Sequence, residues 1–139
     1  MPLMTADAIL ALMEQEFPEV GRLGLRIDAL DDDTLTVEWP SAAGHLRPGG
    51  TVSGPAMMTI ADTAAYFLVL AHVGPQTLAV TTNLNIHFLR KPAPGGLLAE
   101  ARLLKHGARL VVSEVRVRSA ADGRDVAHAT VTYSVPPPR

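Results

Sequence analysis

The chain has 139 residues, with 12 basic and 14 acidic side chains, 47% hydrophobic residues and no cysteine. This length predicts a single domain over residues 1–139, and the lack of cysteine excludes disulfide scaffolds, cysteine-ligated zinc and cysteine nucleophiles. A net charge of −2 and an aromatic content of 4% argue against nucleic-acid binding, which needs basic surfaces or stacking platforms. Met1–Met13 lacks the basic start of a secretory signal, so we expect a cytoplasmic protein.

A helix and a hairpin are predicted first along the chain. Apolar residues between Thr5 and Phe17 recur at helical spacing, with Thr5 as the N-cap and Pro18 marking the end. Residues 23–27 and 35–39 alternate apolar and polar side chains, which predicts two strands joined by the acidic turn Asp31-Asp32-Asp33. Three carboxylates could bind a cation, but no further oxygen ligands follow at calcium-loop spacing, which favours a solvated turn.

The next segment, Gly54–Val73, is almost wholly apolar and long enough to span a bilayer. Ser53-Gly54-Pro55 is a helix start signal, because Ser suits the N-cap and Pro the first turn, and Gly74-Pro75 ends the run. Asp62 lies near the middle, where a charge at the bilayer centre costs about 3 kcal/mol or more. A spanning helix would also separate the strands of one sheet. The sequence therefore predicts a core helix and no membrane partner.

Four strands are predicted after this helix. They cover residues 78–89, 97–104, 110–118 and 126–135, at a hairpin spacing that indicates an antiparallel sheet. In the first of them Thr81, Asn83 and Asn85 alternate with apolar residues, which places the three on one polar face. The predicted fold class is α+β, with a curved antiparallel sheet around a long central helix.

Two features of the central helix could carry chemistry. Asp62 is either a structural acid held by Tyr or Thr hydroxyls or by an Arg, or a general base or nucleophile beside a cleft. The helix start at Gly54 is either an ordinary capped N-terminus or a site whose free backbone N–H groups stabilise an oxyanion. Eight residues separate the two, a rise of about 12 Å, so one small carbonyl group cannot touch both. If both serve one substrate, they come from two copies across a twofold dimer interface.

Three motifs in order resemble the hotdog-fold acyl-CoA thioesterases of the phenylacetate-pathway (PaaI-like) group. They are Gly49–Pro55 followed by Ala61-Asp62-Thr63-Ala64, the stretch Asn85–Ala93, and the strand Ala127–Tyr133. The resemblance implies the hotdog fold, a homodimer and commonly a dimer of dimers (a homotetramer), an acyl-CoA substrate, and neither metal nor bound cofactor. It also implies that Asp62 is the catalytic carboxylate and that the Gly54 N–H of the other subunit polarises the thioester carbonyl.

The chain departs from this family at three positions near the catalytic pair. Ser53 replaces the usual His, and Pro55 replaces the second Gly and supplies no donor. Arg47 stands where an Asn or Gln often holds the thioester or a water, and it could bind an anionic acyl group. These departures affect catalytic competence and substrate class more than fold or dimer.

Further candidates fall into two groups, each with a plain alternative. The substrate pocket could include Tyr66, which would donate to Asp62 or line the acyl site, and Thr81, Thr82 and Asn83, which otherwise are outward polar residues. The phosphates of coenzyme A could meet Arg90, Lys91 and Arg109, which otherwise are surface charges. The five histidines show no metal-ligand spacing.

The sequence therefore predicts hydrolysis of a small aromatic or medium-chain acyl-CoA thioester at a dimer interface. Ser53 and Pro55 motivate an alternative, a non-catalytic protein that binds acyl-CoA or a small ligand and keeps the fold. A hotdog-type hydratase or dehydratase is a third class, and the His and acid dyad of a hydratase motif is not visible in the sequence.

Overall fold

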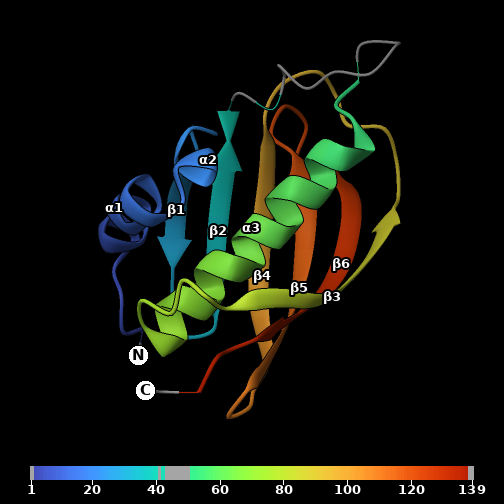
Figure 1. The fold of residues 1–139 in the computed structure, drawn as a ribbon. Helices are drawn as coiled ribbons and strands as arrows, with labels where there is room; N and C mark the ends of the chain where they lie inside the picture. Colours follow the sequence, from blue (N-terminus) through green and yellow to red (C-terminus); the bar gives the residue numbers. More distant parts are fainter. Residues whose placement is uncertain (1, 41, 43–50, 138–139) are drawn as a thin grey trace.

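The computed structural model describes residues 2–40, 42 and 51–137 (Figure 1). In chain order its elements are α1 (Ala6–Glu16), α2 (Pro18–Gly21), β1 (Arg26–Leu30), β2 (Thr34–Trp39), α3 (Gly54–Val73), β3 (Val80–Phe88), β4 (Leu97–His106), β5 (Leu110–Ser119) and β6 (Asp125–Ser134). The predicted order of one helix, two strands, a long helix and four strands is confirmed, and α2 is an additional short helix.

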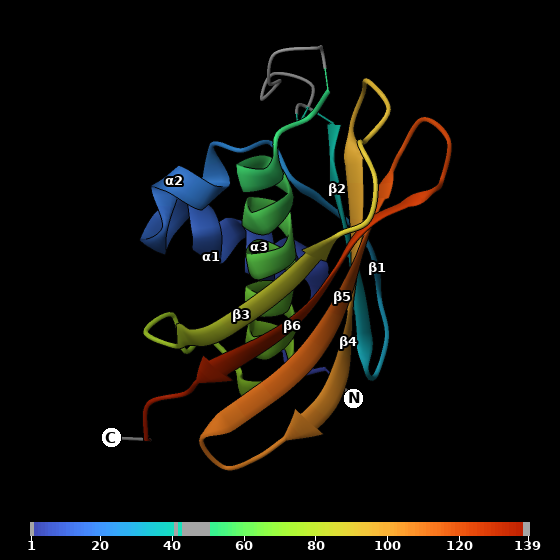
Figure 2. The ribbon, with the colours of Figure 1, turned by 90° about the vertical axis from the view of Figure 1, so that its right-hand side faces the viewer.

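The strands form one antiparallel sheet in the order β1-β2-β4-β5-β6-β3. The sheet curves around α3, which crosses one of its faces and packs chiefly against β4 and β5 (Figure 2). The strand β3 lies at one edge of the sheet, where its described residues pair with β6 alone. This arrangement confirms the predicted α+β class and the hotdog fold.

The helix α3 forms the centre of the hydrophobic core. Its length and composition would also suit a membrane span, but most of it is buried inside the structure. The Ser53 hydroxyl caps its start by accepting a hydrogen bond from the Ala56 N–H at 3.2 Å. Gly74 ends it with a φ of 90°, a backbone conformation that favours glycine. Both predicted ends of this helix are confirmed.

Two elements near the N-terminus differ from the prediction. Thr5 caps α1 as expected, accepting from the Ala8 N–H at 3.1 Å. Pro18, however, starts the short helix α2 instead of only ending α1, because Pro is well suited to the first helical turn. The strand expected at 23–27 begins later, at Arg26, since Gly24 has a φ of 74° that interrupts the extended run.

One irregularity in β3 reorients a candidate site residue. The pairing of β3 with β6 shifts between Thr81 and Asn83, so Thr82 is an extra residue that forms a β-bulge. Alternation along the strand is broken at this point. Thr81 therefore turns toward α3, where its hydroxyl contacts Asp62, and does not share a polar face with Asn83 as predicted.

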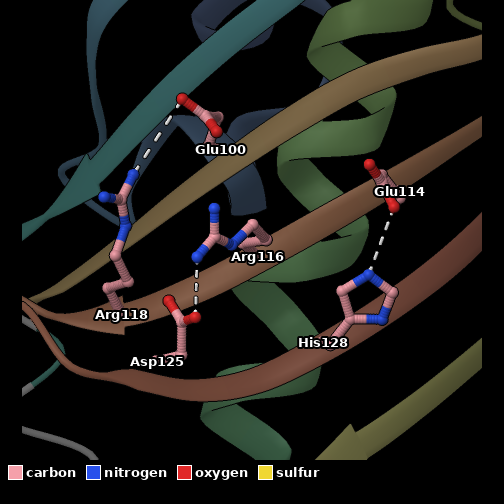
Figure 3. A network of polar contacts seen from close by, with 6 residues as sticks. All are labelled: Glu100, Glu114, Arg116, Arg118, Asp125 and His128. Atoms are coloured by element: carbon pink, nitrogen blue, oxygen red, sulfur yellow. Dashed lines mark hydrogen bonds and ion pairs between the residues drawn. The ribbon is translucent and has the colours of Figure 1, made fainter.

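The sheet face that points away from α3 is polar and carries ion pairs between neighbouring strands (Figure 3). The pairs are Arg116–Asp125 at 2.8 Å, His128–Glu114 at 3.3 Å and Arg118–Glu100 at 3.9 Å. The hydrogen bond from Arg116 holds the pKa of the Asp125 carboxyl below its usual value. The sheet thus has one apolar face covered by α3 and one polar outward face, as predicted for an antiparallel sheet.

Candidate active site

Asp62 lies in the middle of α3 beside a cavity of about 420 Å³. The walls of this cavity come from α3, the start of β3, the end of β6 and the segment where α1 meets α2. The Asp62 residue is half-buried, and it is the one carboxylate among the described residues that line the cavity. The central helix therefore presents a single acid to an open, partly apolar cavity.

Two hydroxyl groups hold one oxygen of the Asp62 carboxylate. Thr81 Oγ1 donates to Oδ1 at 2.7 Å, and the Tyr133 hydroxyl donates to the same oxygen at 2.9 Å. The Tyr133 hydroxyl also lies 3.2 Å from the Asp62 carbonyl oxygen. No described residue donates to Oδ2. Asp62 therefore combines the hydroxyl contacts expected of a structural acid with a second oxygen that is left for chemistry.

Aromatic rings form one wall of this cavity. The rings of Tyr66 and Tyr133 are stacked with centroids 5.6 Å apart, and Phe17 meets Tyr66 edge-on at 6.1 Å. The Tyr66 hydroxyl donates to the Thr77 carbonyl at 2.9 Å. Of the two alternatives for Tyr66, the structure thus shows a cavity-lining position, and the donor to Asp62 is Tyr133.

Tyr133 was not among the predicted site residues, because the alternation along its strand places it with the apolar residues that face the core. A tyrosine on that face is nevertheless a signal, since a buried phenol needs a hydrogen-bond partner. Asp62, the one acid on α3, is an available partner that could have been identified from the sequence.

Burial raises the pKa of both tyrosines above their ordinary value of 10.0. The negative charge of Asp62 adds to this rise of the pKa at Tyr133, and that of Glu16 adds to it at Tyr66. Both phenols therefore stay protonated at neutral pH and act as hydrogen-bond donors.

These raised values predict how stability depends on alkaline pH. The folded state holds the two phenol protons more tightly than the unfolded chain, whose tyrosines titrate near 10.0. The contribution of these two protons to the free energy of unfolding is fully present below pH 10. It is lost as the pH rises toward the pKa values that the tyrosines have in the folded state. We expect Tyr133→Phe to flatten the decline, as measured by urea unfolding at several values between about pH 9 and 11. An equally steep decline in the variant would contradict this account.

Gly54 lies at a second cavity, of about 300 Å³, at the start of α3. The other donors of the first turn are occupied or absent. The Ser53 hydroxyl accepts from the Ala56 N–H, the Ser53 carbonyl accepts from the Met57 N–H, and Pro55 has no N–H. Among the described residues nothing accepts a hydrogen bond from the Gly54 N–H, so it is the first-turn donor left for a ligand.

The remaining candidates are distributed unevenly over the two cavities. Arg90 and Lys91 line the second cavity together with Gly54. Arg109 lines neither cavity and precedes β5, where its carbonyl accepts from the Val135 N–H at 2.7 Å.

The predicted pocket residues of β3 also separate. Thr81 lines the Asp62 cavity, whereas Thr82 donates to the Thr132 carbonyl at 3.3 Å and Asn83 is exposed, and neither of these two lines a cavity. Arg47 lies outside the described residues.

Comparison with known proteins identifies the family of this chain and agrees with its fold. The family model for the thioesterase superfamily matches residues 49–126. A structure from Silicibacter sp. TM1040, named as a thioesterase, has a TM-score of 0.88 and 44% identity and covers 99% of this chain and 95% of its own. A phenylacetic acid degradation-related protein from Ralstonia eutropha JMP134 is also named as a thioesterase. Its structure has a TM-score of 0.78 and 28% identity, and the match covers 91% of this chain and 99% of the Ralstonia chain. The Pseudomonas aeruginosa protein PA1618, named as an esterase, is 30% identical over 83% of this chain and 79% of its own length.

A curved antiparallel sheet around one long central helix defines the hotdog fold, and the family match makes this a hotdog thioester hydrolase. The chain belongs to the thioesterase superfamily. The resemblance to the PaaI-like group is confirmed, since a phenylacetic acid degradation-related protein is among the structures it matches.

Proposed function

We propose that the protein hydrolyses acyl-CoA thioesters of small aromatic or medium-chain acids at a site shared by two copies of the chain. One observation supports a site formed by two copies: Asp62 and Gly54 line different cavities and are separated by about 12 Å along the helix. A single thioester reaches both groups when a second copy brings the start of its own α3 to Asp62. The proposed pair is thus Asp62 of one copy and the Gly54 N–H of the other.

The chemistry follows from these two groups. As a general base, the Asp62 carboxylate takes a proton from water while the water oxygen bonds to the acyl carbon. The carbonyl electron pair moves onto oxygen, which the Gly54 N–H stabilises, and returns as the carbon–sulfur bond breaks. The leaving thiolate then takes the proton from Asp62. As a nucleophile, the carboxylate instead attacks the acyl carbon and expels the thiolate, and water hydrolyses the resulting anhydride.

The open edge of β3 supports a homodimer. The described residues of β3 pair with β6 alone, so backbone groups on the other edge are available to a second copy. Large apolar side chains at the start of this edge are exposed, with Leu78 at 68% and Val80 at 57%. A second copy would cover them, and the proposal extends to a dimer of dimers and to a cytoplasmic location.

The two ends of the substrate suit the two cavities. The aromatic wall of the Asp62 cavity, formed by the stacked rings of Tyr66 and Tyr133, fits an apolar acyl group. Arg90 and Lys91 line the Gly54 cavity, where positive charge favours the phosphates of coenzyme A. Substrate contacts by Arg47, Ser53, Thr82, Asn83 and Arg109 stay predictions.

Phe17 is expected to limit the size of the acyl group. It lines the cavity from the α1–α2 segment and packs against the ring of Tyr66. Phe17→Ala should enlarge the cavity and raise kcat/KM for long acyl-CoAs relative to short ones about tenfold, since one or two methylenes in a pocket are worth this much. The measurement is kcat/KM over a saturated acyl-CoA series, with the exposed Leu104→Ala as a control that lines neither cavity. An unchanged chain-length profile would remove Phe17 from the acyl site.

A panel of acyl-CoAs tests the proposed function directly. We expect the purified protein to release free thiol from benzoyl-CoA or from octanoyl-CoA, and Asp62→Asn to lower this release strongly. Binding of acyl-CoA with no thiol released would favour the non-catalytic binding protein instead. Hydration of an enoyl-CoA would favour the hydratase class.

A further inference from the structure

Asp62 faces the cavity with two chemically different oxygens. Oδ1 accepts hydrogen bonds from Thr81 Oγ1 at 2.7 Å and from the Tyr133 hydroxyl at 2.9 Å. No described residue donates to Oδ2. A carboxylate oxygen that already accepts two short hydrogen bonds is a poorer base and nucleophile than its free neighbour, because the donors stabilise its negative charge.

The two donors are held in place by the sheet. Thr81 and Tyr133 are directly paired across β3 and β6, so their hydroxyls converge on one oxygen from adjacent strands. The bulge at Thr82 turns Thr81 toward α3 and makes this convergence possible. Rotation of the carboxylate would break both bonds, so the pair fixes the plane of the Asp62 side chain.

Tyr133 is itself well anchored. It is almost completely buried, its ring stacks on Tyr66, and the Tyr66 hydroxyl is bonded to the Thr77 carbonyl. Burial and the charge of Asp62 raise the pKa of Tyr133, so it remains a donor at neutral pH. A rigid donor is what a catalytic carboxylate needs from a supporting residue.

We propose that Thr81 and Tyr133 are positioning residues that occupy Oδ1 of Asp62 and leave Oδ2 as the oxygen that acts on the thioester. The proposal rests on the catalytic role of Asp62 given above. It applies equally to the general-base and the nucleophilic route, since each begins at an ionised oxygen with an unoccupied lone pair.

The test measures kcat and KM for benzoyl-CoA and octanoyl-CoA in Thr81→Val, Tyr133→Phe and the double variant. We expect each single change to lower kcat about tenfold with little change in KM, since a hydrogen bond to a charged group is lost. Thr81→Ser keeps the hydroxyl and should restore most of the rate.

Thr130→Val is the matched control for Thr81→Val. It makes the same change at an exposed threonine of β6 that lines neither cavity, and it leaves both bonds to Asp62, so kcat and KM should stay unchanged. Urea unfolding of each variant separates loss of fold from loss of rate, and Thr81→Ser provides a folded reference if Thr81→Val is unstable.

Three outcomes would overturn the proposal. These are an unchanged kcat in both single variants, an equal loss of kcat in Thr130→Val, or a failure of Thr81→Ser to restore the rate. A different result, full activity in Asp62→Asn, would overturn the proposed function itself, so the two failures are distinguishable. In the Asp62→Asn background, Tyr133→Phe should lower the residual rate no further, and a further loss would mean that Tyr133 acts without Asp62.

Discussion

Asp62→Asn should lower kcat/KM for the best acyl-CoA about 10³-fold or more, because the amide can neither take a proton from water nor attack a thioester. Asn is close in size to Asp, and its amide oxygen can still accept the hydrogen bonds from Thr81 and Tyr133. The fold should therefore survive. Release of free thiol under single-turnover and steady-state conditions measures the effect.

Asp62→Ala provides the comparison for this variant. It removes the acceptor as well as the acid, leaving a buried Tyr133 hydroxyl without its carboxylate partner, so it should be both inactive and less stable. Urea unfolding would show the difference in stability. Retained hydrolysis in either variant would exclude Asp62 as the catalytic group.

The second large effect is expected when two inactive variants are combined. Gly54→Ala should fold normally, since the added Cβ would lie 3.6 Å from the ring of Phe88, an ordinary contact. The methyl group would occupy the cavity next to the Gly54 N–H and should lower activity about 10²-fold, comparable to the loss of one oxyanion donor. Alone, neither Gly54→Ala nor Asp62→Asn leaves an intact shared site in a homodimer.

Coexpression of Gly54→Ala and Asp62→Asn should restore activity to about a quarter of the wild-type value. Half of randomly formed dimers are mixed, and each mixed dimer has one site with both functional groups and one site with neither. Two different affinity tags allow the mixed dimers to be purified and assayed separately, where the expected value is about half of wild type. Activity that stays at background in mixed dimers would place Asp62 and Gly54 in independent sites and contradict the shared one.

Both ends of the central helix α3 could be predicted to the residue from the sequence, whereas the start of β1 could not. Ser53 and Gly74 act locally, one as a capping side chain and the other as the residue that adopts a positive φ, so their effect is visible in sequence. The start of β1 depends on Gly24, whose positive φ is not encoded by the alternation of apolar residues around it. The short helix α2 could not be predicted, because a proline such as Pro18 can end one helix or begin the next.

The candidate site shows the same division between local and long-range signals. Asp62 and Gly54 stand out because a lone acid on an apolar helix and a free helix start are local features. Tyr133 is 71 residues from Asp62, and only the tertiary structure brings its hydroxyl to the carboxylate. Thr81 lines the cavity, as one of its two predicted alternatives had it, but a β-bulge breaks the predicted shared face with Asn83, and a bulge depends on the partner strand.

The location of Phe17 and Val20 in the α1–α2 segment has an evolutionary consequence. Asp62 and Gly54 both belong to α3, which lies within the family match at residues 49–126, whereas these two cavity residues lie before it. In the proposed site, substitutions at Phe17 and Val20 would therefore change the shape of the acyl cavity without altering Asp62 or Gly54. Part of the cavity wall is encoded outside the stretch that carries this pair, so a new substrate preference could arise by drift around α1 and α2 while the proposed catalytic pair is kept.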